Sequence, residues 1–168
     1  MNDQVRGPLL RAGVVLGIGL GGFFDGIVFH QLLQWHHMLT SYGHPSNTVP
    51  GLEVNTTWDG IFHSATWIAT IAGIVMLWSV ERRYDMTWSL PLVGAILMGW
   101  GGFNLVEGIV DHQVLGVHHV RDDLGGPLGW DIGFLVWGAS FVVIGWLFSR
   151  RPLGASRATR SRRETRHA

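Results

Sequence analysis

Two stretches of this chain, DGIVFHQLLQWHH at residues 25–37 and EGIVDHQVLGVHH at residues 107–119, follow one pattern and lie 82 residues apart. Each has an acidic residue, then Gly-Ile-Val, then a His-Gln pair, and ends in two adjacent histidines. A second match supports the first, because WDGIF at residues 58–62 is similar to WDIGF at residues 130–134. We therefore predict an internal tandem repeat, and the rest of the sequence shows what kind of element is repeated.

The composition indicates that the repeat lies in a membrane. Of the 168 residues, 47% are hydrophobic and only 14% are charged, whereas a soluble domain carries about 25% charged residues. A helix needs about 20 apolar residues to cross the hydrocarbon core, and long uncharged runs of this kind recur along the chain. We predict four transmembrane helices, at about residues 9–34, 57–80, 88–114 and 130–149.

The expected fold is an all-α integral membrane protein, with four transmembrane helices that form a four-helix bundle as a tandem repeat of two helix pairs. Residues 1–149 form this transmembrane domain, with repeat units at about 9–80 and 88–149. Two helices per unit place both copies in the same direction, with a pseudo-twofold axis along the membrane normal. The first and third helices are expected at the centre, because they carry the acids and histidines that lipid would penalise most. A cleaved signal peptide is the alternative for the first helix, but no A-x-A-like site follows it.

The arginines predict the orientation, because positive residues stay cytoplasmic in short loops. Arg6 and Arg11 precede the first helix, and Arg82 and Arg83 follow the second. The Arg-rich residues 150–168 are expected to be a disordered cytoplasmic tail near anionic lipid headgroups. We therefore predict a multi-pass protein of the bacterial inner membrane with both termini cytoplasmic. The lipid bilayer is the expected partner, and nothing in the tail indicates a nucleic acid.

The histidines and acids carry the chemistry, because the chain has no cysteine. Disulfides, iron–sulfur clusters and thiol nucleophiles are therefore excluded. Counting along the predicted helices gathers eight of the nine histidines toward the outer side of the membrane. Ionisable groups inside a membrane are costly and by default functional, and imidazole with carboxylate suits zinc, copper or iron.

We predict a transition-metal site on the outer side, for metal handling or for metal-dependent catalysis. Its expected core ligands are His30, His63 and His112. Further candidates, as ligands or as partners that orient the ligands, are Asp25, Asp59, Glu107, Asp111, His36, His37, His118 and His119. Asp59 and His63 are four residues apart and would share a helix face, and His30 would align with His37 on a helix that continues past the interface.

The two halves are not identical, because Leu135 occupies in the second half the position of His63 in the first. Three imidazoles, His30, His63 and His112, would leave one position on a single metal for water or a carboxylate. A site near the pseudo-twofold axis is therefore expected to be asymmetric.

Three motifs, GFFDGIVFHQLLQWHH at 22–37, WDGIFH at 58–63 and FNLVEGIVDHQVLGVHH at 103–119, resemble the bacterial domain-of-unknown-function 2243 family of predicted membrane proteins. The resemblance covers residues 12–149. It implies four helices and a bacterial membrane, and it implies no activity.

Other functions stay open at this point. Haem b held between His30 and His112 would make an electron-transfer protein, and Asp25 with Glu107 would suit a proton or ion pathway. A non-catalytic assembly partner of a larger membrane complex is a further alternative. Structural readings also remain: Asp59 and Asp131 would complement helix N-termini, and the histidine pairs would lie at the membrane interface beside Trp35, as aromatic belts do.

Overall fold

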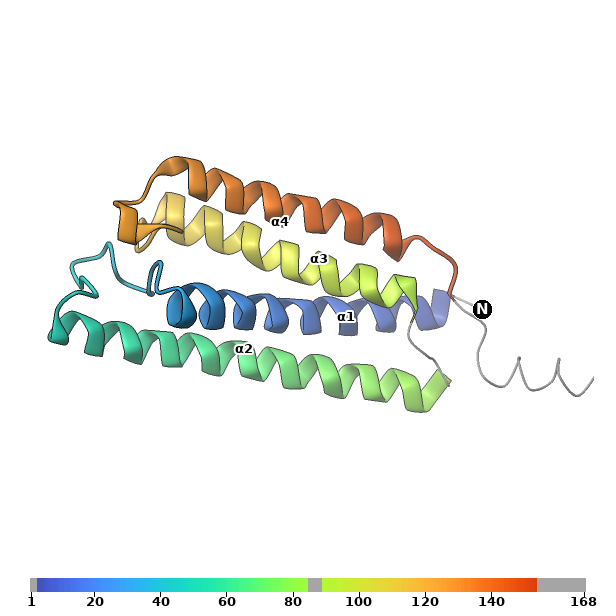
Figure 1. Cartoon of the computed structure of the whole chain (residues 1–168). Coiled ribbons are helices and arrows are strands. Elements are labelled where there is room, and N and C mark those ends of the chain that lie inside the picture. Colours follow the sequence, from blue (N-terminus) through green and yellow to red (C-terminus); the bar gives the residue numbers. More distant parts are fainter. Residues whose placement is uncertain (1–2, 85–88, 154–168) are drawn as a thin grey trace, which may run out of the picture.

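The computed structural model describes residues 3–84 and 89–153, and every regular element in these ranges is a helix (Figure 1). Four helices are long and apolar enough to cross a membrane, which confirms the predicted fold class. The elements are α1 (Asp3–Phe24), continued by the π-helix η1 (Asp25–Leu32), α2 (Val49–Tyr84), α3 (Leu90–Glu107), continued by the π-helix η2 (Gly108–Val114), the short 3-10 helix η3 (Asp122–Leu124) and α4 (Leu128–Ser149). The expected disordered tail lies outside the described residues from 154 onward.

Helix α2 is longer than the sequence predicts, because it begins at Val49 rather than near residue 57. Pro50 fits the first turn of a helix, where its missing N–H has no helical partner and its fixed φ is favourable. Two extra turns therefore stand between the loop and the predicted span. They carry Asn55, which is fully buried and packs against the loop that follows η1.

Helices α1 and α3 lie at the centre of the bundle, as expected. Helix α1 packs on α2 and α3, and α3 also packs on α4, so the helices follow one another in the order α2, α1, α3, α4 (Figure 1). Glycine permits the closest approach, because a Cβ on Gly17 would clash with the carbonyl group of Ile96 and one on Gly99 with that of Val14. Small residues allow such backbone contact between membrane helices.

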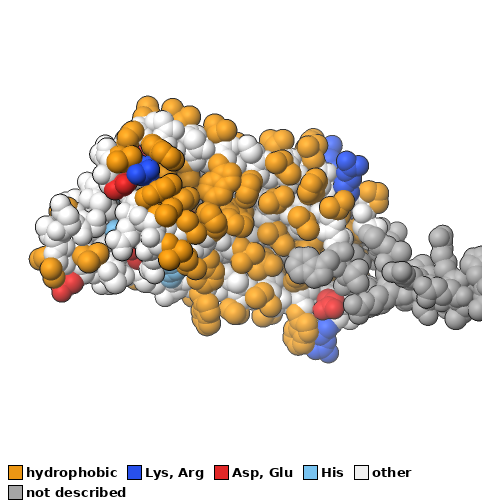
Figure 2. Space-filling model, viewed as in Figure 1, with side chains coloured by type: hydrophobic (Ala, Val, Ile, Leu, Met, Phe, Trp, Pro, Cys, Tyr) orange, Lys and Arg blue, Asp and Glu red, His pale blue; other side chains and the backbone are white. Residues whose placement is uncertain are grey.

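Side chains are distributed as a membrane requires. Hydrophobic side chains cover the middle of the face in Figure 2, and most of its arginines gather at the end where the chain starts. At that end Arg6 donates to the carbonyl groups of Ser149 and Arg151, the second at 3.2 Å, and so joins the start of α1 to the end of α4. The loops that connect η1 to α2 and η2 to α4 lie at the opposite end of the bundle (Figure 1), and the histidines of the described residues lie in or near these loops.

Candidate metal centre

Each of the two central helices changes from α to π geometry at its acidic residue. Hydrogen bonds in a π-helix join residues five apart, and five positions separate Asp25 from His30 and Glu107 from His112. The change therefore places the acid and the histidine on one face, and Asp25 Oδ2 lies 3.0 Å from His30 Nε2. The sequence analysis missed this geometry, although the repeated spacing of five was its signal.

Both π-helices end in a left-handed residue that turns the chain back. Gln34 has φ 50° and Gly116 has φ 58°, at equivalent positions of the repeat. The expected alignment of His30 with His37 on a continuous helix is therefore wrong, because η1 ends at Leu32. The turns instead bury His36 and His118, which are 1% and 0% exposed, so these two rings do not lie on the surface of the bundle.

The two loops that follow the turns hold each other's histidines. His36 Nδ1–H donates to the carbonyl group of Val120 at 3.0 Å, and His118 Nδ1–H donates to that of Met38 at 3.2 Å. These two bonds are equivalent under the 82-residue repeat. A carbonyl oxygen only accepts, so each ring carries its proton on Nδ1 and keeps a lone pair on Nε2.

Burial keeps both rings neutral. It lowers the pKa of His36 to about 4, with a further contribution from the nearby His30. Burial likewise lowers the pKa of His118 well below its usual range, with His36 adding to the effect. The two rings stack 4.7 Å apart at an interplanar angle of 6°. Neutral imidazole is the form of histidine that binds metals.

Four buried residues from both halves meet beside these rings, and each offers one ligand atom within 4.8 Å of the others. We call His30, His36, Glu107 and His118 the four-residue group. His118 Nε2 lies 3.8 Å from Glu107 Oε1. Within the described part of the chain, Nε2 of His36, Nε2 of His118 and both Glu107 oxygens have no hydrogen-bond partner, and His30 Nε2 lies next to the Asp25 carboxylate. Buried polar atoms are normally satisfied, so their convergence indicates a ligand.

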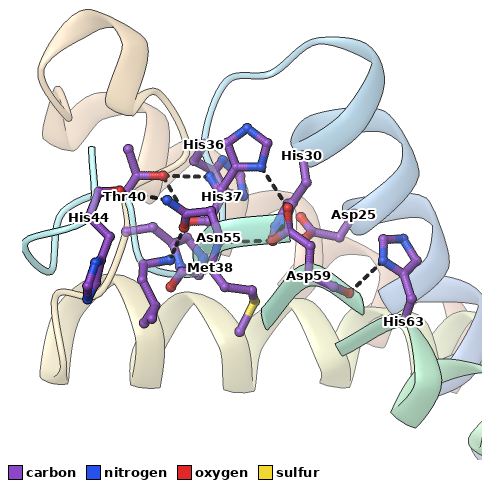
Figure 3. A network of polar contacts seen from close by, with 12 residues as sticks. Asp25, His30, His36, His37, Met38, Thr40, His44, Asn55, Asp59 and His63 are labelled. Carbon is purple, nitrogen blue, oxygen red and sulfur yellow. Dashed lines mark hydrogen bonds and ion pairs between the residues drawn. The ribbon is translucent and has the colours of Figure 1, made fainter. Parts of the chain in front are cut away.

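Asp59 orients the third imidazole of the group (Figure 3). Its Oδ1 accepts from His30 Nδ1 at 2.9 Å and from the Met38 amide at 3.1 Å, and its Oδ2 accepts from His37 Nδ1 at 2.6 Å. His30 therefore also directs Nε2 toward the group. Asp59 lies ten residues into α2, so the alternative in which it complements a helix N-terminus is wrong.

Asp131 makes the equivalent contacts in the second half. It accepts from His119 Nδ1 at 2.7 Å and from the Val120 amide at 2.9 Å, but His112 Nδ1 lies 3.6 Å away. Among the described residues, neither ring nitrogen of His112 has a hydrogen-bond partner. Asp131 therefore does not hold His112 as Asp59 holds His30, and His112 lies outside the four-residue group.

His63 also lies outside the group. Its Nδ1–H donates to the backbone carbonyl of Asp59 at 2.7 Å, and its Nε2 faces Gly26 (Figure 3). The structure therefore does not direct His63 and the Asp59 carboxylate toward one ion. Asp111 is half-buried and does not belong to the four-residue group. Asn55, which the sequence analysis did not single out, accepts from the Leu39 amide at 2.8 Å and so fixes the first loop.

The positions proposed for haem are filled by other imidazoles. The ring of His30 lies 4.5 Å from that of His36, and the ring of His112 lies 4.9 Å from that of His118. These four rings form one packed cluster, so a porphyrin held by His30 and His112 would have to separate them.

The comparisons agree with a membrane protein. A family model described as "Predicted membrane protein (DUF2243)" matches residues 12–152. No curated protein and no solved structure was found to match the chain.

Proposed function

The chain belongs to the DUF2243 family of predicted membrane proteins, and we propose that it binds a transition-metal ion at the four-residue group of His30, His36, Glu107 and His118. One observation supports this most directly. All three imidazoles use Nδ1 in hydrogen bonds to a carboxylate or a carbonyl group, so their Nε2 atoms converge with Glu107, and those of His36 and His118 keep a lone pair. Metal-binding histidines nearly always donate their other ring N–H in this way.

Electrostatics favour a cation at this place. A buried carboxylate without a partner is costly, and lone pairs that face it add to the repulsion. A divalent ion removes both effects and accepts all four ligand atoms. Three imidazoles with one carboxylate suit zinc, copper or iron. Such a site would serve either to handle a metal for export and delivery or to catalyse a reaction at an open coordination position.

We further propose that the site faces outward from a bacterial inner membrane. The support is the position of Arg82, Arg83 and Arg150, at the end of the bundle opposite to the histidines. A reporter that is active only when exported should be inactive when fused after Ala168 and active when inserted after Tyr42. The reverse pattern would overturn this orientation.

Elemental analysis and an absorption spectrum of one purified sample test the proposal. We expect stoichiometric zinc, copper or iron without a Soret band. The variant His36→Gln should lose the metal, and His44→Gln should keep it, because His44 lies in the loop outside the four-residue group. A Soret band would establish the haem alternative instead. A sample that contains neither metal nor haem would favour an ion pathway or an assembly role.

A further inference from the structure

Two further buried side chains that could bind a metal lie beside the four-residue group. Asp25 and His112 are each 2% exposed, and within the described ranges Oδ1 of Asp25 and both ring nitrogens of His112 lack a hydrogen-bond partner. Asp25 Oδ2 lies 3.0 Å from His30 Nε2, and the His112 ring lies 4.9 Å from that of His118. Both residues therefore border the same centre, and both are of types that bind metals.

The negative charge of the centre also favours metal ions. Asp25 and Glu107 are two buried carboxylates, on η1 and at the end of α3. Among the described residues, the salt bridges of this centre pair carboxylates only with histidines, and arginine contributes to none of them. Divalent ions would compensate these two buried carboxylates, because buried charge that is left uncompensated is costly.

The repeat divides the potential metal ligands into two equal sets. Each set has one acid and two histidines at matching positions: Asp25, His30 and His36 in the first half, and Glu107, His112 and His118 in the second. The four-residue group contains two histidines of the first set, but one acid and one histidine of the second set. Two ions would use both complete sets. Two-metal sites hold their ions about 3.5–4 Å apart, a separation that fits donors packed as closely as these.

We propose that the centre is dinuclear, with Asp25 and His112 as the ligands that a second ion adds. This inference rests on the proposed function, because the second ion binds beside the first. The two carboxylates then lie between or beside two cations. Each ion receives imidazole nitrogen and carboxylate oxygen, the ligands found in the mononuclear site, so both positions take the same class of divalent transition metal.

Metal stoichiometry tests the proposal on the full chain in lipid nanodiscs. Equilibrium dialysis against Zn²⁺ should give about two ions per wild-type chain and about one in Asp25→Asn and in His112→Gln, the number expected when a two-metal site loses one position. His44→Gln is the control and should keep both. Retention of both ions by Asp25→Asn and His112→Gln would overturn the proposal.

Wild-type protein alone provides a second measurement, which does not depend on whether the variants fold. Loaded with Co²⁺, it should show spin coupling between neighbouring ions in its electron paramagnetic resonance spectrum. A wild-type chain that binds one ion, with an uncoupled spectrum, would overturn the second ion and leave the proposed function intact. A wild-type chain that binds no Zn²⁺ and no Co²⁺ would overturn the proposed function itself.

Discussion

Replacing Asp59 with Asn should weaken binding of the first metal ion while leaving the fold in place. The carboxylate accepts from His30 Nδ1 at 2.9 Å, from His37 Nδ1 at 2.6 Å and from the Met38 amide at 3.1 Å. Asn keeps one oxygen for His30 and Met38, but its NH₂ group faces His37 and cannot accept. Because Asn carries no charge, the bond to His30 becomes a neutral hydrogen bond. A charge-assisted bond is about twice as strong as a neutral one.

The expected magnitude follows from that loss. Removing a partner that orients a metal ligand costs 10–100-fold in affinity. Asp59→Asn should lie near the lower limit, about 10-fold or ~1.4 kcal/mol, because one oxygen still orients His30. Asp59→Ala should approach about 100-fold, because the buried His30 Nδ1–H is then left without this acceptor.

The second half of the repeat supplies the matched control. Asp131 holds His119 and Val120 as Asp59 holds its loop, but it lies 3.6 Å from His112, which is outside the four-residue group. Asp131→Asn should change the first affinity by less than ~3-fold, below the range for residues that orient a ligand. Chelator competition for the first equivalent of Zn²⁺ measures all three variants, and thermal unfolding verifies their fold. An equal loss in Asp131→Asn, or no loss in Asp59→Asn, would refute the reasoning.

Three further predictions concern other parts of the structure. Elemental analysis should find the metal retained in His63→Leu, because His63 bonds to its own helix. Loss of the metal would show that His63 is a ligand. Gly17→Ala should lower the free energy of unfolding by about 1–3 kcal/mol through overpacking, whereas Gly102→Ala, where a Cβ meets no described atom within 4 Å, should not; equal thermal shifts would contradict this. Because burial lowers the pKa of His36 to about 4 from 6.5, the unfolded chain binds more protons between these values. The metal-free protein should therefore lose thermal stability as the pH falls from 6.5 toward 4, with a smaller slope in His36→Gln, and a flat profile would disagree.

The sequence by itself determined the kind of fold and the residue types of the site. Apolar runs of about the length that crosses a membrane predict helices, because the backbone must satisfy its own hydrogen bonds in lipid, and four helices of this kind are present. Acids and histidines within those runs are costly in lipid, which predicted that α1 and α3 lie together at the centre. The candidate ligands His30, His36, Glu107 and His118 were all named from these patterns.

The tertiary structure decided which of those residues meet. Helical periodicity assumes one continuous α-helix, and on that assumption His30 shares a face with His37. The change to a π-helix after Phe24 and the left-handed turn at Gln34 break that assumption. The loop that follows each turn also bonds to the loop of the other half. Local spacing along one helix carries no information on these crossed bonds, so the set of ligands that converge became visible only when both halves were packed together.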